Sequence, residues 1–483
     1  MSKLLLTLFI MISISRIFGL ECICDYDSSG RKLSKRNTRI VNFQTAQLVG
    51  ENYKRPYGTS SLHNTELYLT NDNSCQSEQV HITLGSETNN EVIISYTNKN
   101  ITALSRVEYS INKDDLMNGS TFHTAIGKSF SYSANKWIAR RLYKPSMGKA
   151  FKTEAEILAM QNTYEWAKDP ITGEHYSSYY NYTSVQLYLG RDDNPQMIYD
   201  SPMIFEVSLQ DLIPGETYYY RVSGSCEIFE FVYPRVPGSL SHSIYPFKVG
   251  LTADLGQTEV SSASIDALKS MEPDVVLLSG DLSYADGWPE LWDTFGRLIQ
   301  SLAAFVPLLT TGGNHEISSS EAWQSYQARY PTPHYSSGSP NFCYWGREVG
   351  VMNVISLCSY AGYNSTSLQY QWLSNYLASR INRRLTPWII VIMHAPWYNT
   401  NNGHWKEGEV MRLSMEPLLY EYGVDLVIAG HVHSYERTTP VYNSISNICG
   451  ATYINIGDGG NYENAYTDWR FPADSWSVFR EGN

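Results

Sequence analysis

Five short islands of metal-donor side chains constrain the fold of this chain more than any other feature of its sequence. The islands are Asp254-Leu255-Gly256, Gly280-Asp281-Leu282-Ser283-Tyr284, Gly313-Asn314-His315-Glu316, Val391-Ile392-Met393-His394 and Gly430-His431-Val432-His433. All but one follow a short apolar run, at residues 247–253, 275–279, 388–393 and 425–429. Because the strand ends of open α/β sheets hold ligands, the islands are expected to converge on one crevice. The sequence therefore predicts an α/β fold with a metal site.

The order and identity of these islands resemble the purple acid phosphatases, a branch of the calcineurin-like metallophosphoesterases. The resemblance covers roughly residues 245–481. One island alone is a weak signal, because a Gly-His-Val-His segment can hold two unrelated histidines near a strand end. Five islands in the family's order are highly specific. The resemblance implies a βαβαβ metallophosphoesterase core, arranged as an α+β sandwich.

The resemblance also implies two metal positions that share one carboxylate. The first position would take Asp254, Asp281, Tyr284 and His433, and the second would take Asp281, Asn314, His394 and His431. A carboxylate has two oxygens, so Asp281 can bridge both ions. His431 and His433 stand two residues apart, which on an extended segment directs both side chains to one side.

Two departures from the wider superfamily indicate which metals are bound. Most relatives begin with Asp-x-His, whereas Gly256 stands at the third position here, and Tyr284 can replace the missing ligand as a phenolate. A phenolate favours Fe(III), so the expected cofactor is Fe(III) with a divalent ion, which is Zn, Fe or Mn. The charges of the two metal ions, the two carboxylates, the phenolate and a metal-bound hydroxide sum to about +1, and this positive charge would face an anionic ester. A metal-bound hydroxide would then attack phosphorus without a protein nucleophile.

Two more histidines are candidates for catalysis and substrate binding. His315 follows Asn314 and resembles the family's phosphate-contacting histidine, and His404 resembles its general acid. Either imidazole can exchange a proton near neutral pH. Plant-type members often have two adjacent histidines at this point, but Gly403 precedes His404 here. One of the family's phosphate contacts is therefore in question.

These residues predict an acid phosphatase that hydrolyses phosphate monoesters, with a small phosphate ester as its partner. Two alternatives stay open. A metallophosphodiesterase with the same core would prefer a bis-aryl phosphate, and a non-catalytic binding protein could occupy a degenerate phosphatase fold. The intact set of seven ligands counts against the second alternative. Homodimer formation also stays open.

The charge of the chain excludes some partners. The formal net charge is −12, so nucleic acid and an anionic membrane surface would both be repelled. The length of 483 residues is more than one domain needs, and the hydrophobic fraction of 42% is enough to bury cores. We therefore expect a folded protein that binds neither nucleic acid nor a membrane.

The first 19 residues are typical of a secretory signal peptide. Lys3 precedes an apolar stretch at 4–14 that is too short to span a bilayer, and small residues follow it. Export predicts a secreted, lysosomal or vacuolar glycoprotein. The acceptor sequons lie at Asn100, Asn118, Asn181 and Asn364.

Seven cysteines in an exported protein are expected to pair for the most part, with one left over. Their connectivity cannot be deduced from the sequence. Cys343 and Cys358 flank a probable pair of strands at 342–346 and 351–357. A disulfide across this hairpin is the best single prediction.

Changes in composition and in strand and helix patterns along the chain predict the domain organisation. Residues 20–76 form a polar arm, and residues 77–238 alternate like antiparallel strands, with an insertion near 133–180. This second segment resembles the fibronectin-III-like domain of plant-type purple acid phosphatases. Residues 245–483 alternate strands with helical patterns at 262–271, 288–304, 367–381 and 409–422, which predicts the catalytic domain. The family normally runs on through further strands after residue 476, so we expect a C-terminal truncation.

Overall fold

A computed structural model describes residues 76–98, 104–135, 198–236, 245–318 and 321–482 of the chain. The predicted signal peptide, nearly all of the polar arm and most of the insertion lie outside the described residues, as do the sequons at Asn100 and Asn181. The other two sequon asparagines, Asn118 and Asn364, are exposed. No helix among the described residues combines the length and the apolar character needed to cross a membrane.

The N-terminal part of the described chain is a sandwich of two antiparallel sheets. One sheet has the order β1 (Ser77–Leu84), β2 (Val92–Asn98), β8 (Met203–Leu209), β5 (Lys128–Phe130), and the other has the order β10 (Phe229–Val232), β9 (Thr217–Val222), β3 (Arg106–Ser110), β4 (His123–Ile126). The sheets pack face to face because each strand buries alternate side chains. On β9, every second residue is buried, namely Tyr218, Tyr220 and Val222. The predicted all-β character of this region is confirmed.

Smaller elements complete this part. Helix α2 (Lys113–Asn118) begins at Asn112, whose side chain accepts a hydrogen bond from the Asp114 N–H, and ends at Gly119 in the left-handed region. Strand β6 (Ser133–Asn135) pairs with β7 (Ile198–Asp200). These two strands form a separate two-stranded sheet.

Two further sheets form the C-terminal part. Strands β11 (Val249–Thr252), β12 (Val275–Ser279) and β13 (Leu308–Thr311) are parallel, and helices α4 (Glu259–Ser270) and α5 (Glu290–Ala303) connect them. The seven-stranded mixed sheet has the order β14 (Trp345–Val349), β15 (Met352–Ser356), β16 (Trp388–Ile392), β17 (Leu426–Ala429), β21 (Thr452–Ile456), β18 (Tyr435–Thr438), β22 (Ser477–Glu481). Its helices are α7 (Leu368–Arg380) and α8 (Glu409–Glu421). All four predicted helices are present.

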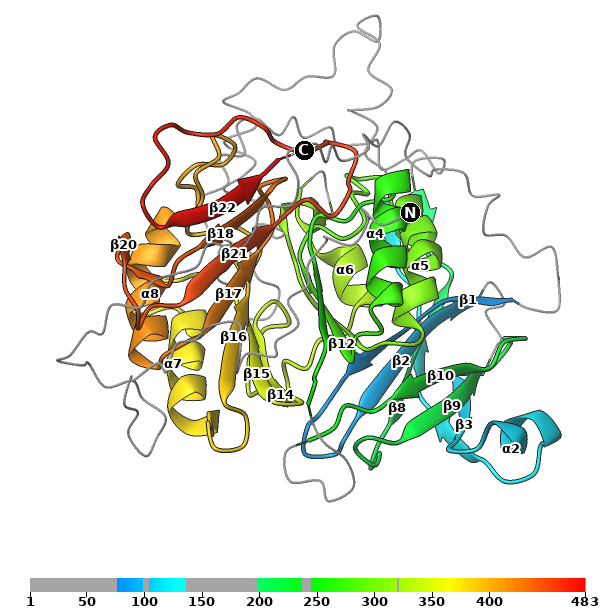
Figure 1. Cartoon of the computed structure of the whole chain (residues 1–483). Coiled ribbons are helices and arrows are strands. Elements are labelled where there is room, and N and C mark those ends of the chain that lie inside the picture. Colours follow the sequence, from blue (N-terminus) through cyan, green and yellow to red (C-terminus); the bar gives the residue numbers. More distant parts are fainter. Residues whose placement is uncertain (1–75, 99–103, 136–197, 237–244, 319–320, 483) are drawn as a thin grey trace, which may run out of the picture.

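The two sheets lie face to face, and helices cover the outer side of each sheet, which gives four layers (Figure 1). On β12, Val276 and Leu278 pack with the buried faces of α4 and α5, whereas Val275 and Leu277 belong to the core between the sheets. On β16, Ile390 and Ile392 share that inner core. Because successive strand residues point to opposite faces, one strand supplies both cores. The predicted α/β sandwich is confirmed.

The inner core continues into the N-terminal sandwich. A single cluster of buried side chains joins sandwich residues such as Val80 and Phe205 to Leu277 and Ile390 of the two C-terminal sheets. Polar contacts reinforce this junction, since Arg297 on α5 forms an ion pair with Glu78 at 2.7 Å. The two parts of the chain therefore stabilise each other by shared burial of apolar surface.

The predicted disulfide between Cys343 and Cys358 is wrong. Both are buried thiols that no disulfide joins. The hairpin ladder begins only at the pair Trp345 and Ser356, two positions inside the two cysteines. Beyond the ladder the Cys358 backbone bonds to the side chain of Gln369 on α7, so the two cysteine-bearing segments separate. Elsewhere, Cys226 and Cys449 each take part in a disulfide.

Helix α6 (Gln324–Arg329) contributes a buried arginine, Arg329, to the junction between the sandwich and the C-terminal part. The Arg329 guanidinium donates to Gln79 Oε1 at 2.7 Å and to Tyr199 Oη at 2.6 Å, and it lies 2.9 Å from Asp293 Oδ1. Its side chain is only 3% exposed. This one residue therefore links β1, β7 and α5.

We expect Arg329→Met to lower the free energy of unfolding by about 3–5 kcal/mol, because it leaves the Asp293 carboxylate without its buried counter-charge. Urea unfolding followed by tryptophan fluorescence measures the change. The matched control is Arg384→Met, which alters an exposed arginine and should change stability by less than about 0.5 kcal/mol. Equal stability of both variants would contradict this role of Arg329.

Candidate metal centre

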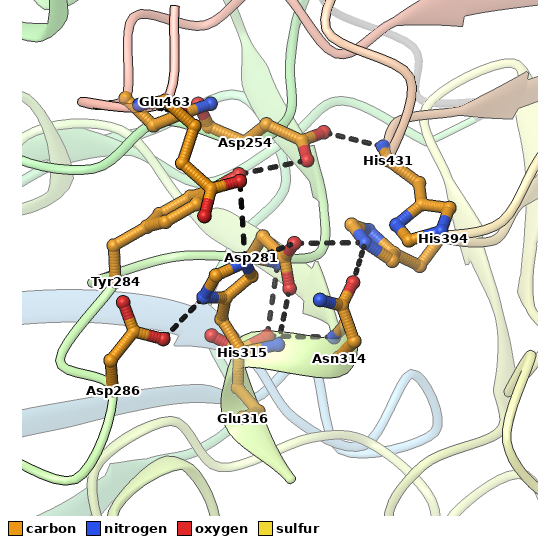
Figure 2. A network of polar contacts seen from close by, with 12 residues as sticks. Asp254, Asp281, Tyr284, Asp286, Asn314, His315, Glu316, His394, His431 and Glu463 are labelled. Atoms are coloured by element: carbon orange, nitrogen blue, oxygen red, sulfur yellow. Dashed lines mark hydrogen bonds and ion pairs between the residues drawn. The ribbon is translucent and has the colours of Figure 1, made fainter. Parts of the chain in front are cut away.

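All five donor islands lie at the carboxyl ends of strands. Asp254, Asp281, Asn314, His394 and His431 follow β11, β12, β13, β16 and β17 respectively. Strand β13 was not predicted, because its sequence is short and ends in two threonines. These strand ends bring the donors to one place (Figure 2). None of the seven predicted ligands is more than 9% exposed.

The first group of donors contains Asp254, Tyr284 and His433. The Tyr284 hydroxyl donates to Asp254 Oδ1 at 3.0 Å and lies 3.0 Å from His433 Nε2. His433 Nε2 is 3.4 Å from Asp254 Oδ1. A carboxylate, a phenol and an imidazole thus direct their polar atoms at a common point, as three ligands of one ion would.

The second group contains Asp281, Asn314, His394 and His431. His394 Nε2 lies 3.0 Å from both Asn314 Oδ1 and Asp281 Oδ2, while its Nδ1 is 2.9 Å from the Ser279 carbonyl. With Nδ1–H donating to that carbonyl, Nε2 carries the lone pair, which is the tautomer a metal-ligating histidine needs. Ligand atoms of Asp281, His394 and His431 all lie within 4.8 Å of one another.

Asp281 lies between the two groups (Figure 2). Its Oδ1 accepts a hydrogen bond from the His315 backbone N–H at 2.8 Å. Its Oδ2 is buried and accepts no hydrogen bond from any described residue. A buried acceptor without a donor is costly unless a cation lies beside it. The donor set therefore fits two metal ions that share the Asp281 carboxylate.

Electrostatics at the second group also favour positive charge. Burial disfavours a charged imidazole, but the carboxylates of Asp281 and Asp254 outweigh it and raise the pKa of His394 to about 9. Burial likewise opposes ionisation of Asp281, yet His394 and His315 hold its pKa well below the usual range. The neighbouring His431 behaves differently, because burial and the nearby His404 lower its pKa to about 4. His431 is thus neutral without a metal, whereas a metal bound at this group would displace the Nε2 proton of His394.

Glycines in the islands give the ligands room. A Cβ at Gly280 would overlap the His394 ring, one at Gly313 would overlap the Asp281 carboxylate, and one at Gly430 would overlap Asp254 Oδ2. Any side chain at these positions would therefore displace a donor.

The backbone is strained where it presents the ligands. Asp254, Asp281, Tyr284 and His431 have φ angles of 52°, 53°, 54° and 68°. Non-glycine residues rarely adopt this region, and each such residue costs about 1–3 kcal/mol. Glu316 helps to hold the conformation, because its carboxylate accepts hydrogen bonds from the backbone N–H groups of Asp281, Leu282 and Gly313.

His315 faces the centre from the first group. Its Nδ1 is 2.5 Å from Asp286 Oδ1, and its Nε2 is 3.9 Å from Asp281 Oδ2 and 4.0 Å from Glu463 Oε2. Burial opposes protonation, but Asp286 and Asp281 raise the pKa of His315 well above its usual value. The ring therefore carries a positive charge, and its Nε2–H can donate to an anion.

His404 lies beside the second group. Its ring centroid is 3.8 Å from that of His431, and its Nδ1 is 2.6 Å from Glu407 Oε2. The same Glu407 oxygen is 3.1 Å from His431 Nε2. Atoms of His404, Glu407 and His431 also form a second set that could hold a metal ion.

Sequence reasoning assigned no role to four carboxylates at this site: Asp286, Glu316, Glu407 and Glu463. Three of them carry a local signal. Asp286 stands two residues after Tyr284, Glu316 ends the third island, and Glu407 stands three residues after His404. Glu463 lies on a loop far from any island and carries no such signal.

Comparisons with known proteins agree with this geometry. Residues 247–435 match the family model described as calcineurin-like phosphoesterase. Purple acid phosphatase 21 of Arabidopsis thaliana is 42% identical over 290 residues, which cover 59% of this chain and 64% of that protein. Purple acid phosphatase 18 of the same plant is 41% identical over 303 residues, which cover 61% of this chain and 68% of that protein.

The fold is also similar to a solved structure. The purple acid phosphatase PPD1 from yellow lupin (Lupinus luteus) seeds superposes with a TM-score of 0.62 at 18% identity, covering 85% of this chain and 69% of that chain. The fold and the donor set define a calcineurin-like metallophosphoesterase. Within that class, the chain belongs to the purple acid phosphatase family, and membership implies a dinuclear metal site. The chain spans just under two thirds, 64%, of the first of these relatives.

Proposed function

We propose that this protein is an acid phosphatase that hydrolyses phosphate monoesters at a dinuclear metal centre. The observation that carries the proposal is the convergence of two donor groups on Asp281, with His315 and His404 beside them. The curated relatives with 41–42% identity are named purple acid phosphatases, which supports the same activity for this chain.

The proposed cofactor is Fe(III) with a divalent ion. Asp254, Tyr284 and His433 would hold the ferric ion, Asn314, His394 and His431 would hold the divalent ion, and Asp281 would serve both. The phenol of Tyr284 supports iron at the first position, since a phenolate is an anionic oxygen donor suited to a trivalent ion. When bound, such a pair supplies Lewis acidity toward phosphoryl oxygens and activates water at acid to neutral pH.

The proposed role of His315 is to bind the phosphoryl group. Its ring is charged because Asp286 and Asp281 raise its pKa. Because Nδ1 is engaged by Asp286 at 2.5 Å, Nε2–H is the donor left for an anionic oxygen. A hydrogen bond between two charged groups is about twice as strong as a neutral one.

The proposed role of His404 is to protonate the leaving alkoxide. Its Nδ1 is fixed by Glu407 at 2.6 Å, so Nε2 is the atom that delivers the proton. Glu407 orients the ring, which is the arrangement that general acid catalysis needs. The 3.8 Å contact with the His431 ring keeps His404 beside the second metal position.

We also propose that the protein is exported. The apolar segment after Lys3 supports export, and Asn118 and Asn364 are exposed enough to accept glycans. Expression in a secretory host with and without glycosidase treatment tests this. A product retained in the cytosol without glycans would contradict it.

A substrate panel is the first test of the activity. The purified chain, loaded with iron and zinc, should hydrolyse nitrophenyl phosphate and an alkyl phosphate faster than bis-nitrophenyl phosphate at acid pH. A preference for the bis-aryl ester would instead support a phosphodiesterase. A chain that binds both metals but hydrolyses none of these esters would identify a non-catalytic binding protein.

We expect His404→Ala to lower kcat for the alkyl phosphate by about 10²- to 10⁴-fold, which is the usual contribution of a general acid. The loss should be smaller for nitrophenyl phosphate, whose leaving group needs less protonation. Metal content by mass spectrometry should equal that of the parent. The control is His334→Ala, which removes a histidine ring that bonds to Thr332. Loss of metal in His404→Ala would make His404 a ligand instead.

We expect Tyr284→Phe to lose the visible absorption that a phenolate gives with Fe(III), because one hydroxyl is removed and the ring is kept. Absorption spectra and circular dichroism of the iron-loaded protein measure colour and fold. Tyr326→Phe is the matched control, since Tyr326 is equally buried but its hydroxyl bonds to Thr310. Retained colour in Tyr284→Phe would contradict its assignment as a ligand.

We expect Asp286→Asn to move the alkaline limb of the pH profile of kcat/KM to lower pH by about one unit or more. His315 is protonated below its pKa, and Asp286 is the carboxylate that raises this pKa most. Without it, the positive charge is lost at lower pH. Asp266→Asn, on the exposed face of α4, should leave the limb in place. An unchanged limb in Asp286→Asn would exclude His315 as the charged donor.

A further inference from the structure

Tyr466 lies inside the site, although no island contains it. Its backbone N–H donates to the His433 carbonyl at 2.7 Å, and its own carbonyl accepts from the Asn401 side chain at 2.9 Å. Hydrogen bonds from two separate segments thus fix the backbone of a loop residue. The side chain is presented to the site from a defined position.

The ring of Tyr466 lies between a predicted ligand and the predicted general acid. Its centroid is 4.5 Å from that of His433 and 6.0 Å from that of His404. His433 belongs to the first donor group, whereas His404 lies beside the second. The ring therefore borders the space above both metal positions.

Gly403 leaves the room that this ring occupies. A Cβ added at residue 403 would lie 2.6 Å from Tyr466 Cδ2, which is closer than two carbon atoms can approach. A larger residue at 403 would therefore displace the Tyr466 ring. The observed position of the Tyr466 ring thus depends on glycine at residue 403.

The Tyr466 hydroxyl is available to a ligand. In the part of the chain that the structure describes, it makes no hydrogen bond. A tyrosine is protonated at acid and neutral pH, so it can donate.

We propose that Tyr466 is a substrate-binding residue whose hydroxyl donates a hydrogen bond to an oxygen of the bound phosphoryl group. The inference rests on the proposed phosphatase function and adds a contact to that of His315. Tyr466 reaches the site from the loop between β21 and β22, whereas His315 reaches it from the end of β13. The two donors would bind one anion from different elements.

The test is Tyr466→Phe, which keeps the ring and removes only the donor. We expect KM for nitrophenyl phosphate and the inhibition constant of inorganic phosphate both to rise roughly tenfold or more, the usual effect of losing a hydrogen bond to a charged group. The change in kcat should be small, because the contact exists before and during the reaction. Metal content and visible absorption should match those of the parent. Tyr335→Phe, at a tyrosine that is 78% exposed, is the control.

A second variant separates binding from packing. We expect Gly403→Ala to raise the same two constants by displacing the ring, and to have little further effect in a Tyr466→Phe background. Fully additive effects would overturn the dependence between the two positions. Values for Tyr466→Phe within twofold of the parent would overturn the proposed contact, as would loss of metal.

Failure of the proposed function is a separate outcome. A parent that hydrolyses no ester refutes the phosphatase, but binding of inorganic phosphate by calorimetry still decides the role of Tyr466. Weaker phosphate binding by Tyr466→Phe than by the parent would support the contact. A parent that binds no phosphate overturns it.

Discussion

The buried carboxylate of Asp281 is the constraint on which the rest of the site depends. A charge taken out of water must be met by opposite charge or by donors. Here His394 lies 3.0 Å away, and the His315 N–H donates at 2.8 Å. Glu316 holds the Asp281 backbone in place. The strand ends of β12, β13 and β16 are thus arranged around one acidic group, and both donor groups include or border it.

Much of this arrangement could be predicted because its signals are local. Strands β9 and β12 coincide with the predicted apolar or alternating segments, and the donors come directly after strands. The convergence of Asp254 and Asn314 follows from the rule that parallel strands end at one edge of a sheet. Strand β13 was missed because four residues ending in two threonines give no clear pattern.

What could not be predicted depends on contacts between distant segments. Glu463 approaches His315 from a loop about 150 residues away in sequence, and no pattern indicates such a contact. The bridge between Cys343 and Cys358 was inferred from a hairpin whose ladder ends two positions short of the cysteines. Likewise, alternation within β1 and β2 predicts a buried face but not that this face continues into the core beneath the metal centre.

That continuous core changes how the N-terminal sandwich should be regarded. Its inner side chains belong to the same buried cluster as those of the two sheets that carry the ligands. The sandwich therefore contributes to the stability of these sheets. Loosening it would expose the apolar surface under β12 and β16 and disturb the strained turn that presents Asp281. Substitutions in the core of the sandwich, far from the metal centre, can therefore lower the temperature at which the metal centre unfolds, while the ligands themselves stay unchanged.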